Sequence, residues 1–295
     1  MSDLSDLLAA ARRAAEAAAD VHRAAAGRVD PTRWQEKGRS DFVTEVDLEA
    51  ERTIVGILLD TFPEHRILAE ESAGDAPDAA SDLAPEAALE AASSSAPVRW
   101  IIDPLDGTTN WLHGYPEYAV SIAAEDEAGL AAAVVLNSAT GECFEATRGG
   151  GARLDGGPIR VSALEELRLA LVGTGFPFKR LETLPAYLET FSTVLRTTSG
   201  IRRAGSAALD LCDVACGRLD AFFEFHLMPW DVAAGALIVQ EAGGWFEPLA
   251  VPGLEAEGAG SPVASLPTGG YVAGGPGVRT AFLGLMPLGS TAANG

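Results

Sequence analysis

Hydrophobic positions near the start of the chain recur at the spacing of a helix. Apolar residues three or four positions apart predict an amphipathic helix over residues 3–26 and a second one over residues 46–61, which Pro63 ends. Between these helices, residues 30–41 carry proline, glycine and several charges, and this composition predicts a loop. The chain is therefore expected to begin with two helices that each bury one apolar face.

Shorter apolar runs follow, and their close spacing is typical of an antiparallel sheet. A short strand is predicted at 67–69. From residue 98 onward, glycine-containing turns separate runs at 98–102, 118–124, 131–136 and 142–147, which predicts an antiparallel meander. Residues 73–97 interrupt this series with small, acidic and proline-containing sequence. We interpret them as an insertion that loops over the surface, because such a composition cannot build a packed core.

The second half of the chain alternates between strand and helix patterns. Strands are predicted at 169–174, 201–203, 221–225, 245–247 and 271–273, and helices at 184–197, 206–216, 231–242 and 277–286. An α+β half followed by an α/β half indicates an α/β protein with layered sheets. We expect one catalytic unit over residues 1–295, with subdomains at about 1–147 and 148–295.

Composition narrows the possible partners and the compartment. The formal net charge of −21 repels nucleic acid and anionic membranes, so no direct contact with either is expected. No apolar run approaches the length of a membrane span, and the alanine-rich start is interrupted by charges, unlike a signal peptide. The three cysteines form no paired motif and are expected to be reduced thiols, which favours a cytoplasmic protein.

The most specific sequence feature is the stretch from Trp100 to Asn110. It places Asp103 and Asp106 three residues apart directly after a strand, with a proline between them and a glycine behind them that predict a sharp turn. Carboxylates, a free carbonyl and neighbouring hydroxyl groups are the oxygen ligands that suit Mg²⁺. The motif therefore predicts metal-assisted phosphate chemistry.

Three further segments place carboxylates at the ends of predicted elements, at Asp47, Glu70 and Asp231. Each has an ordinary structural explanation, because Asp47 and Asp231 could simply cap helices and Glu70 could belong to a solvated pair with Glu71. All of them together with the Asp103 motif, in this order, favour a shared metal site.

As a set, these motifs resemble the inositol monophosphatase family, the Mg²⁺-dependent, lithium-sensitive phosphatases related to fructose-1,6-bisphosphatase. The matching segments are 41–47, 70–72, 100–110 and 230–235, and Gly243 and Gly244 also fit. The resemblance covers most of the chain. It implies a layered αβαβα sandwich, usually assembled as a homodimer.

The resemblance also implies residue roles. Two to three Mg²⁺ ions would be held by Glu70, Asp103, Asp106, Asp231 and the backbone carbonyl of Leu105. Glu70 would support the third, weaker ion and so counts with Thr108 and Asp47 as catalytic, the last two orienting and activating the attacking water. Substrate contacts would come from Lys37, Asp106, Gly107, Thr108, Gly205, Ser206, Ala207, Glu224 and Asp231.

The substrate is less closely defined. Thr109 stands where histidinol-phosphate phosphatases often have lysine, and segment 201–210 is similar to bacterial inositol monophosphatases. Both favour inositol-1-phosphate or a related polyol or sugar phosphate. Direct attack by a metal-activated water is predicted, because no residue needs to become covalently modified. His226 falls in a segment that commonly carries glycine, so the pocket wall is expected to be bulkier. Alternatives are a phosphatase for histidinol phosphate, a nucleotide bisphosphate or fructose-1,6-bisphosphate, or a transcription or RNA-complex accessory protein.

Overall fold

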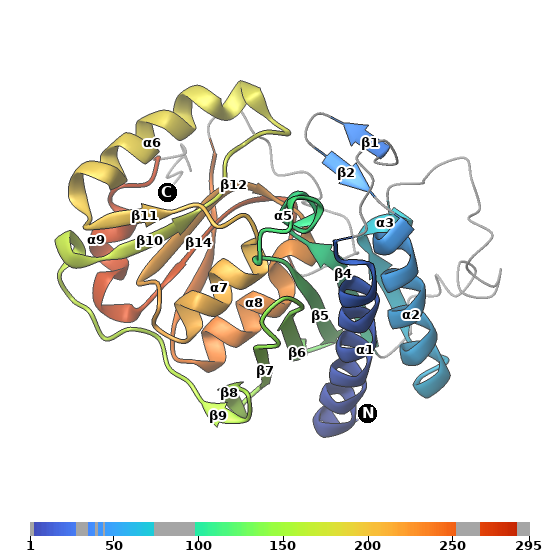
Figure 1. Cartoon of the computed structure of the whole chain (residues 1–295). Coiled ribbons are helices and arrows are strands. Elements are labelled where there is room, and N and C mark those ends of the chain that lie inside the picture. The colour runs from blue at the N-terminus through green and yellow to red at the C-terminus, as the bar shows by residue number, and fades with distance from the viewer. Residues whose placement is uncertain are drawn as a thin grey trace, which may run out of the picture.

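The described part of the chain is a stack of five layers in the order helix, sheet, helix, sheet, helix (Figure 1). The computed structural model describes residues 3–27, 35–38, 41–43, 45–73, 98–251 and 266–287, and at 35–43 and 73 it describes the backbone alone. The predicted αβαβα sandwich is therefore confirmed. The insertion predicted at 73–97 lies almost wholly outside the described residues.

The outer helical layer on the N-terminal side is built from α1 (Leu4–Ala25) and α2 (Glu45–Thr61), as predicted. The buried face of α1 is rich in alanine, whose small side chain lets the helix lie close to the sheet below. Between the two helices, the predicted loop is partly wrong. Strands β1 (Gln35–Gly38) and β2 (Asp41–Val43) pair there as a short antiparallel hairpin.

The first sheet has seven strands that lie side by side in chain order. Only the pair β3–β4 is parallel, and the rest form the predicted antiparallel meander. The last two short strands, β8 and β9, each begin at a glycine. The bounds are β3 (Arg66–Ala69), β4 (Val98–Asp106), β5 (Ala119–Asp126), β6 (Gly129–Asn137), β7 (Cys143–Thr147), β8 (Gly151–Leu154) and β9 (Gly157–Pro158).

The second sheet has five strands in the order β11, β10, β12, β14, β13. Strand β10 is parallel to both neighbours, whereas β14 runs antiparallel to both of its own. The predicted strands are confirmed as β10 (Leu171–Thr174), β11 (Gly200–Arg202), β12 (Ala221–Leu227), β13 (Trp245–Leu249) and β14 (Gly269–Gly274).

Helices α6 (Leu184–Thr197) and α9 (Arg279–Leu283) cover the outer face of the second sheet (Figure 1). Helix α6 has the predicted bounds. The helix predicted over 277–286 is wrong in length, because a 3₁₀ turn over Pro276–Val278 precedes α9 and the α-helix ends before Gly284.

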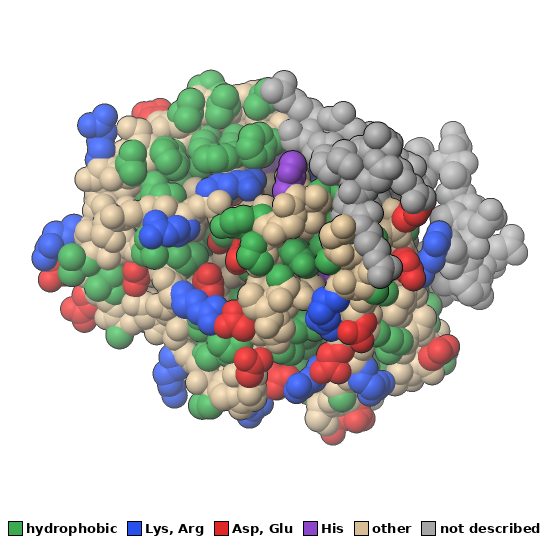
Figure 2. Space-filling view, viewed as in Figure 1, with side chains coloured by type: hydrophobic (Ala, Val, Ile, Leu, Met, Phe, Trp, Pro, Cys, Tyr) green, Lys and Arg blue, Asp and Glu red, His purple; other side chains and the backbone are tan. Residues whose placement is uncertain are grey.

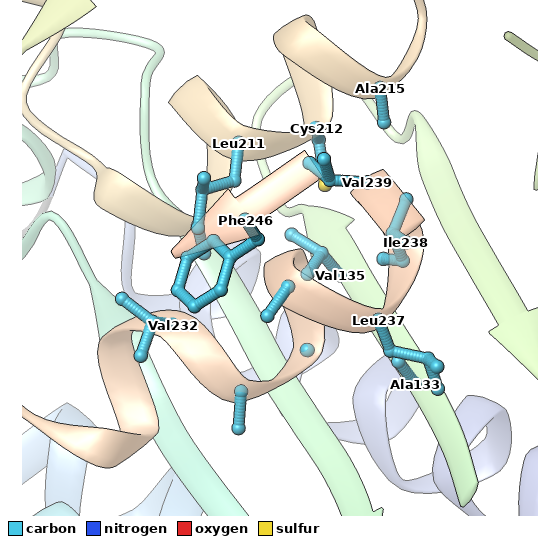
Figure 3. Close-up of a cluster of buried hydrophobic side chains, with 14 of the residues drawn as sticks. Ala133, Val135, Leu211, Cys212, Ala215, Val232, Leu237, Ile238, Val239 and Phe246 are labelled. Atoms are coloured by element: carbon cyan, nitrogen blue, oxygen red, sulfur yellow. The ribbon is translucent and has the colours of Figure 1, made fainter. Parts of the chain in front are cut away.

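The central layer consists of α7 (Ala207–Ala215) and α8 (Pro229–Glu241), which lie between the two sheets. Figure 3 shows α8 packed between α7, strand β6 and Phe246 of β13. A helix in contact on all sides must be apolar all round, and α8 is so over its middle, residues 232–239, where every residue is buried. Gly235 permits the close approach, because a Cβ there would lie 2.7 Å from the Cβ of Leu211.

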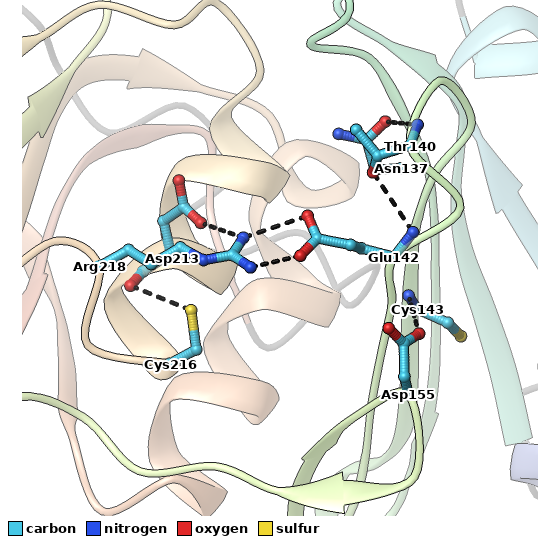
Figure 4. Close-up of polar contacts among 8 residues, drawn as sticks. All are labelled: Asn137, Thr140, Glu142, Cys143, Asp155, Asp213, Cys216 and Arg218. Carbon is cyan, nitrogen blue, oxygen red and sulfur yellow. Dashed lines mark hydrogen bonds and ion pairs between the residues drawn. The ribbon is translucent and has the colours of Figure 1, made fainter.

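A bridge of charged groups joins the central helices to the first sheet on the molecular surface (Figure 4). The guanidinium group of Arg218, just beyond α7, donates to both carboxylate oxygens of Glu142 beside β7 and to Oδ1 of Asp213 at 3.1 Å. Side-chain ion pairs on the surface thus connect the central helices to the first sheet, in addition to the contacts of the core.

Two surface properties bear on possible partners. Hydrophobic side chains gather over α6 (Figure 2), and Leu181, Leu188 and Leu195 are exposed there. We call these three leucines the α6 patch.

Among the helices of the described residues, none combines the length and the apolar character needed to span a bilayer. Cys143 and Cys212 are buried free thiols and Cys216 is a half-buried one, as expected.

Candidate active site

A bulge in β4 creates the central pair of carboxylates. Asp103 pairs with Ser121 and Asp106 with Ala119, so three steps along β4 face two along β5. Pro104 occupies the bulge, where its missing N–H disrupts no ladder bond. The predicted turn between the two aspartates is wrong, because β4 continues through both, whereas the turn predicted behind them is present at Gly107. The backbone N–H of Leu105 donates to Asp103 Oδ1 at 3.0 Å and fixes that carboxylate.

Asp106 is held from the opposite half of the molecule. The hydroxyl of Ser206 donates to Asp106 Oδ2 at 2.6 Å, and the backbone N–H of Ala208 donates to the same oxygen at 2.8 Å. Ser206 also caps the start of α7 by accepting from the N–H of Leu209. Both bonds use one carboxylate oxygen, so Oδ1 of Asp106 remains for another ligand.

Thr108 and Asp47 meet at the same place, although 61 residues separate them. Helix α5 (Thr108–His113) starts directly after β4, and α2 brings Asp47 to it. The Thr108 hydroxyl lies 3.1 Å from Asp47 Oδ1 and 3.1 Å from the carbonyl oxygen of Leu105. Gly107 permits this turn, because its φ is +92° and a Cβ would lie 2.8 Å from the carbonyl oxygen of Glu117.

Glu70 and Asp231 approach from two further elements. Buried Glu51 of α2 accepts from the N–H of Glu71 at 2.8 Å and from the Ser72 hydroxyl, which fixes helix α3 (Glu70–Ala73). Glu71 is buried, so the alternative of a solvated pair is wrong. Asp231 does cap α8, since Oδ2 accepts from the N–H of Met228 at 2.6 Å, yet it also lines the central cavity.

These residues face one cavity of about 660 Å³ between the ends of the two sheets. Glu70, Asp103, Leu105, Asp106 and Asp231 all line it, together with Gly107, Thr108, Gly205, Ser206, Ala207 and Glu224. Asp47 adjoins the cavity through Thr108. Nearly every predicted site residue is thus brought together; the side chain of Lys37 lies outside the described residues.

The carboxylates that line the cavity repel one another electrostatically. Burial raises the pKa of Asp103 well above its ordinary value, and the nearby charges of Glu70, Asp106 and Asp231 raise it further. Burial also raises the pKa of Asp106, although its bonds to Ser206 and Ala208 act in the opposite direction. A bound cation would relieve this repulsion.

The donor set fits a hard divalent cation. Three aspartates, a glutamate and a backbone carbonyl supply only oxygen, which is the preference of Mg²⁺. Within the described ranges, no three acidic, histidine or cysteine side chains already stand at the spacing of a closed metal cage. One carboxylate oxygen each of Asp103 and Asp106 accepts no hydrogen bond among the described residues and is available for an ion.

A second wall of the cavity contains residues to which the sequence assigned no role. The loop after β10 contributes Phe176, Phe178, Lys179 and Arg180. Arg203 comes from the end of β11, and its guanidinium carbon lies 5.5 Å and 5.3 Å from the ring centroids of Phe176 and Phe178. The only sequence signal for this wall was its position beside the ends of strands.

Asp210 and His226 also belong to this wall, and His226 lines the cavity as expected for a bulkier wall. Thr109 lines the cavity beside Thr108. Asn110 connects the walls, because its Nδ2 donates to the carbonyls of Glu117 at 2.7 Å and Ala204 at 2.9 Å. Gly205 leaves room for it, since a Cβ there would lie 2.9 Å from that nitrogen.

Solved structures of inositol monophosphatases share the fold of this chain. A structure from Anabaena superposes with a TM-score of 0.76 at 32% identity, covering 97% of this chain and 98% of the other. The suhB extragenic suppressor protein from Bartonella henselae gives 0.78 at 34% identity, covering 96% and 99%.

The chain belongs to the inositol monophosphatase family, whose sequence profile matches residues 3–265. Among its relatives, "Nus factor SuhB" of Pseudomonas aeruginosa is 46% identical over 243 residues, which is 82% of this chain and 84% of the relative. "Nus factor SuhB" of Escherichia coli is 41% identical over 215 residues, covering 73% and 74%. The family is confirmed, while these names fit the transcription-accessory alternative.

Proposed function

We propose that this protein is a Mg²⁺-dependent phosphatase for a small phosphate monoester. The observation that carries the proposal is the convergence of carboxylates from four separate elements, α3, β4, α2 and α8, on one cavity beside Thr108. Glu70, Asp103, Asp106, Asp231 and the carbonyl of Leu105 would hold the ions. Bound Mg²⁺ would neutralise the phosphate and acidify the attacking water.

Thr108 and Asp47 are suited to orient that water. A threonine hydroxyl has one proton, and when it donates this proton to Asp47 its oxygen lone pairs accept a hydrogen bond from water. The water's own lone pair is then directed away from Thr108. The backbone amides of Gly107 and Thr108 would bind the phosphate, because Gly107 carries no side chain that would block close approach.

The leaving group would be a polyol or sugar. Ser206 and the neighbouring backbone of Gly205 and Ala207 line the cavity opposite the metal ligands, and Glu224 offers an acceptor for hydroxyl groups. Inositol-1-phosphate is the first candidate. Histidinol phosphate, nucleotide bisphosphates and fructose-1,6-bisphosphate are the alternatives.

A substrate panel tests this proposal. Released phosphate is measured for inositol-1-phosphate, the alternatives and cyclohexyl phosphate, a hydroxyl-free ring, with and without Mg²⁺. We expect Mg²⁺-dependent and lithium-sensitive release that is fastest from inositol-1-phosphate. Release without metal would contradict the mechanism, and faster release from histidinol phosphate would contradict the substrate.

A second candidate function is that of a transcription accessory protein, which the name Nus factor of the relatives favours. Those names also weigh against the expectation of no contact with nucleic acid. The net charge of −21 nevertheless favours a protein partner over a direct contact with nucleic acid, which is also negatively charged. The Asp106→Asn variant separates the two functions. It should release no phosphate, yet should still bind a purified transcription complex if the accessory role is real.

A homodimer remains part of the proposal. The α6 patch exposes three leucines on one side of the molecule, and exposed apolar patches of this kind are typical of protein interfaces. Sedimentation velocity at micromolar concentration tests it, and a single species at the monomer mass would contradict it.

A further inference from the structure

The second wall of the cavity contains a carboxylate that the proposed mechanism does not use. Asp210 of α7 is 2% exposed and lines the cavity together with Glu224 of β12. Glu224 has an expected role in binding a hydroxyl group, whereas Asp210 has none. The two residues lie on different elements, and both are separate from the proposed metal ligands in sequence.

The backbone of β10 leaves room for both carboxylates. A Cβ at Gly173 would lie 3.5 Å from Cγ of Asp210, and a Cβ at Gly175 would lie 2.0 Å from Oε1 of Glu224. Residues two apart along a strand direction share a face. The two carboxylates therefore lie over successive positions on one face of this strand and its extension. A side chain at position 175 would displace Glu224, whereas one at position 173 would be in ordinary contact with Asp210.

Neither carboxylate is satisfied by the protein around it. Among the described residues, no hydrogen bond ends on a side-chain oxygen of Asp210 or Glu224. Both side chains line the cavity, so a ligand in the cavity can donate hydrogen bonds to them. Burial raises the pKa of Asp210 well above its ordinary value, and the charge of Glu224 raises it further. A ligand that brings donors into the cavity would relieve both penalties.

Neutral donors fit this place better than a cation. Arg203 and Lys179 are near enough to lower the pKa of Glu224 against the larger effect of burial, which raises it to about 8. Positive charge is thus already present, and an ammonium group would be repelled by it. Hydroxyl groups donate to carboxylates without that repulsion.

We propose that Asp210 is a specificity-determining residue that acts with Glu224 to accept hydrogen bonds from the hydroxyl groups of a polyol leaving group. The inference rests on the proposed phosphatase function and deepens it, because it assigns recognition of the leaving group to a pair of carboxylates. Substrates with a single hydroxyl-free substituent on the phosphate would not use Asp210.

Binding of the dephosphorylated product tests the inference without turnover. Calorimetry with myo-inositol, in the presence of Mg²⁺ and inorganic phosphate, is compared for the wild type, Asp210→Ala, Asp210→Asn and Asp213→Asn. Asp213 is the matched control, one turn along α7 and bonded to Arg218 outside the cavity. We expect Asp210→Ala to bind roughly tenfold to a hundredfold more weakly, Asp210→Asn to lose less, and Asp213→Asn to be unchanged. Equal binding by all four proteins would overturn the inference.

Kinetics with inositol-1-phosphate and cyclohexyl phosphate provide the second readout. In Asp210→Ala, kcat/KM should fall for the polyol ester, mainly through KM, and stay within about threefold for the hydroxyl-free ester. An equal loss on both substrates would show a structural role and overturn the inference. If the wild type binds inositol but hydrolyses neither ester, the proposed function fails while the recognition role stands.

If the Asp210→Ala variant has a much lower melting temperature than the wild type, the wild-type protein alone still tests the inference. At least one mono-deoxy inositol should then bind as weakly as inositol binds to the variant. Equal affinity across the whole deoxy series would contradict recognition by the carboxylate pair.

Discussion

The two walls of the cavity differ in how the sequence encodes them. We call the side of the cavity that carries the proposed metal ligands the metal wall. Its centre is one continuous stretch of chain, the bulged end of β4 and the start of α5, which contains Asp103, Leu105, Asp106 and Thr108. The other wall is assembled from the loop after β10, the end of β11, helix α7 and strand β12. Ion binding needs several oxygens at short fixed distances, and one stretch of chain can provide the centre of such a site, whereas a leaving group needs only a surface of suitable shape with hydrogen-bond acceptors for its hydroxyl groups.

The largest expected effect concerns the metal wall. Asp106→Asn removes a charged ligand while the amide oxygen still accepts from Ser206 and Ala208. Phosphate release should fall by roughly three orders of magnitude, equivalent to about 4 kcal/mol. The melting temperature of the metal-free protein should hold or rise, because a buried charge is gone. Activity close to wild type would show that the continuous motif does not hold the ion and would break the comparison.

A smaller effect concerns charge on both walls and its dependence on pH. The pKa of Glu224 rises to about 8 from an ordinary value of 4.5, and the pKa of Asp103 rises too. The folded state therefore holds more protons than the unfolded state between these values, so stability is highest at low pH and falls as pH rises. Urea unfolding of metal-free protein should show a decline from pH 5 to pH 8, at most about 1.4 kcal/mol per pH unit for each group.

The Glu224→Gln variant sharpens this result. It should remove the part of the fall in stability with rising pH that the Glu224 carboxyl group causes. Mg²⁺ should flatten the part that belongs to Asp103. A stability that rises between pH 5 and pH 8 without metal would contradict the burial of both carboxylates.

The smallest effect concerns the bridge between the halves. Arg218→Met removes the ion pairs with Glu142 and Asp213, which are partly exposed and are therefore worth about 1 kcal/mol or less. Chemical denaturation should report that loss, with phosphate release unchanged. Arg168→Met is the matched control, since Arg168 pairs with Glu166 in the same segment and bridges nothing. A loss of several kcal/mol specific to Arg218 would mean that the walls depend on this surface contact.

Long periodic segments were predictable and short ones were not. The bounds of α6 follow from its pattern, whereas the hairpin of β1 and β2 is too short to show alternation. Pro104 suggested a turn because proline usually interrupts strands, but a bulge lets the strand continue around it. Arg203 and Asp210 were unpredictable as site residues, since only the packing of β10 between β11 and β12 brings them to the cavity.

The bonds from Ser206 and Ala208 to Asp106 have a consequence for the newly made chain. About one hundred residues separate the carboxylate from its two donors, so Asp106 leaves the ribosome long before they are synthesised. Until α7 emerges, nothing from the second half fixes that oxygen. A ribosome-bound fragment ending before residue 200 should therefore have its first sheet but not a preorganised site at Asp106, so the proposed ion site would be completed late in synthesis.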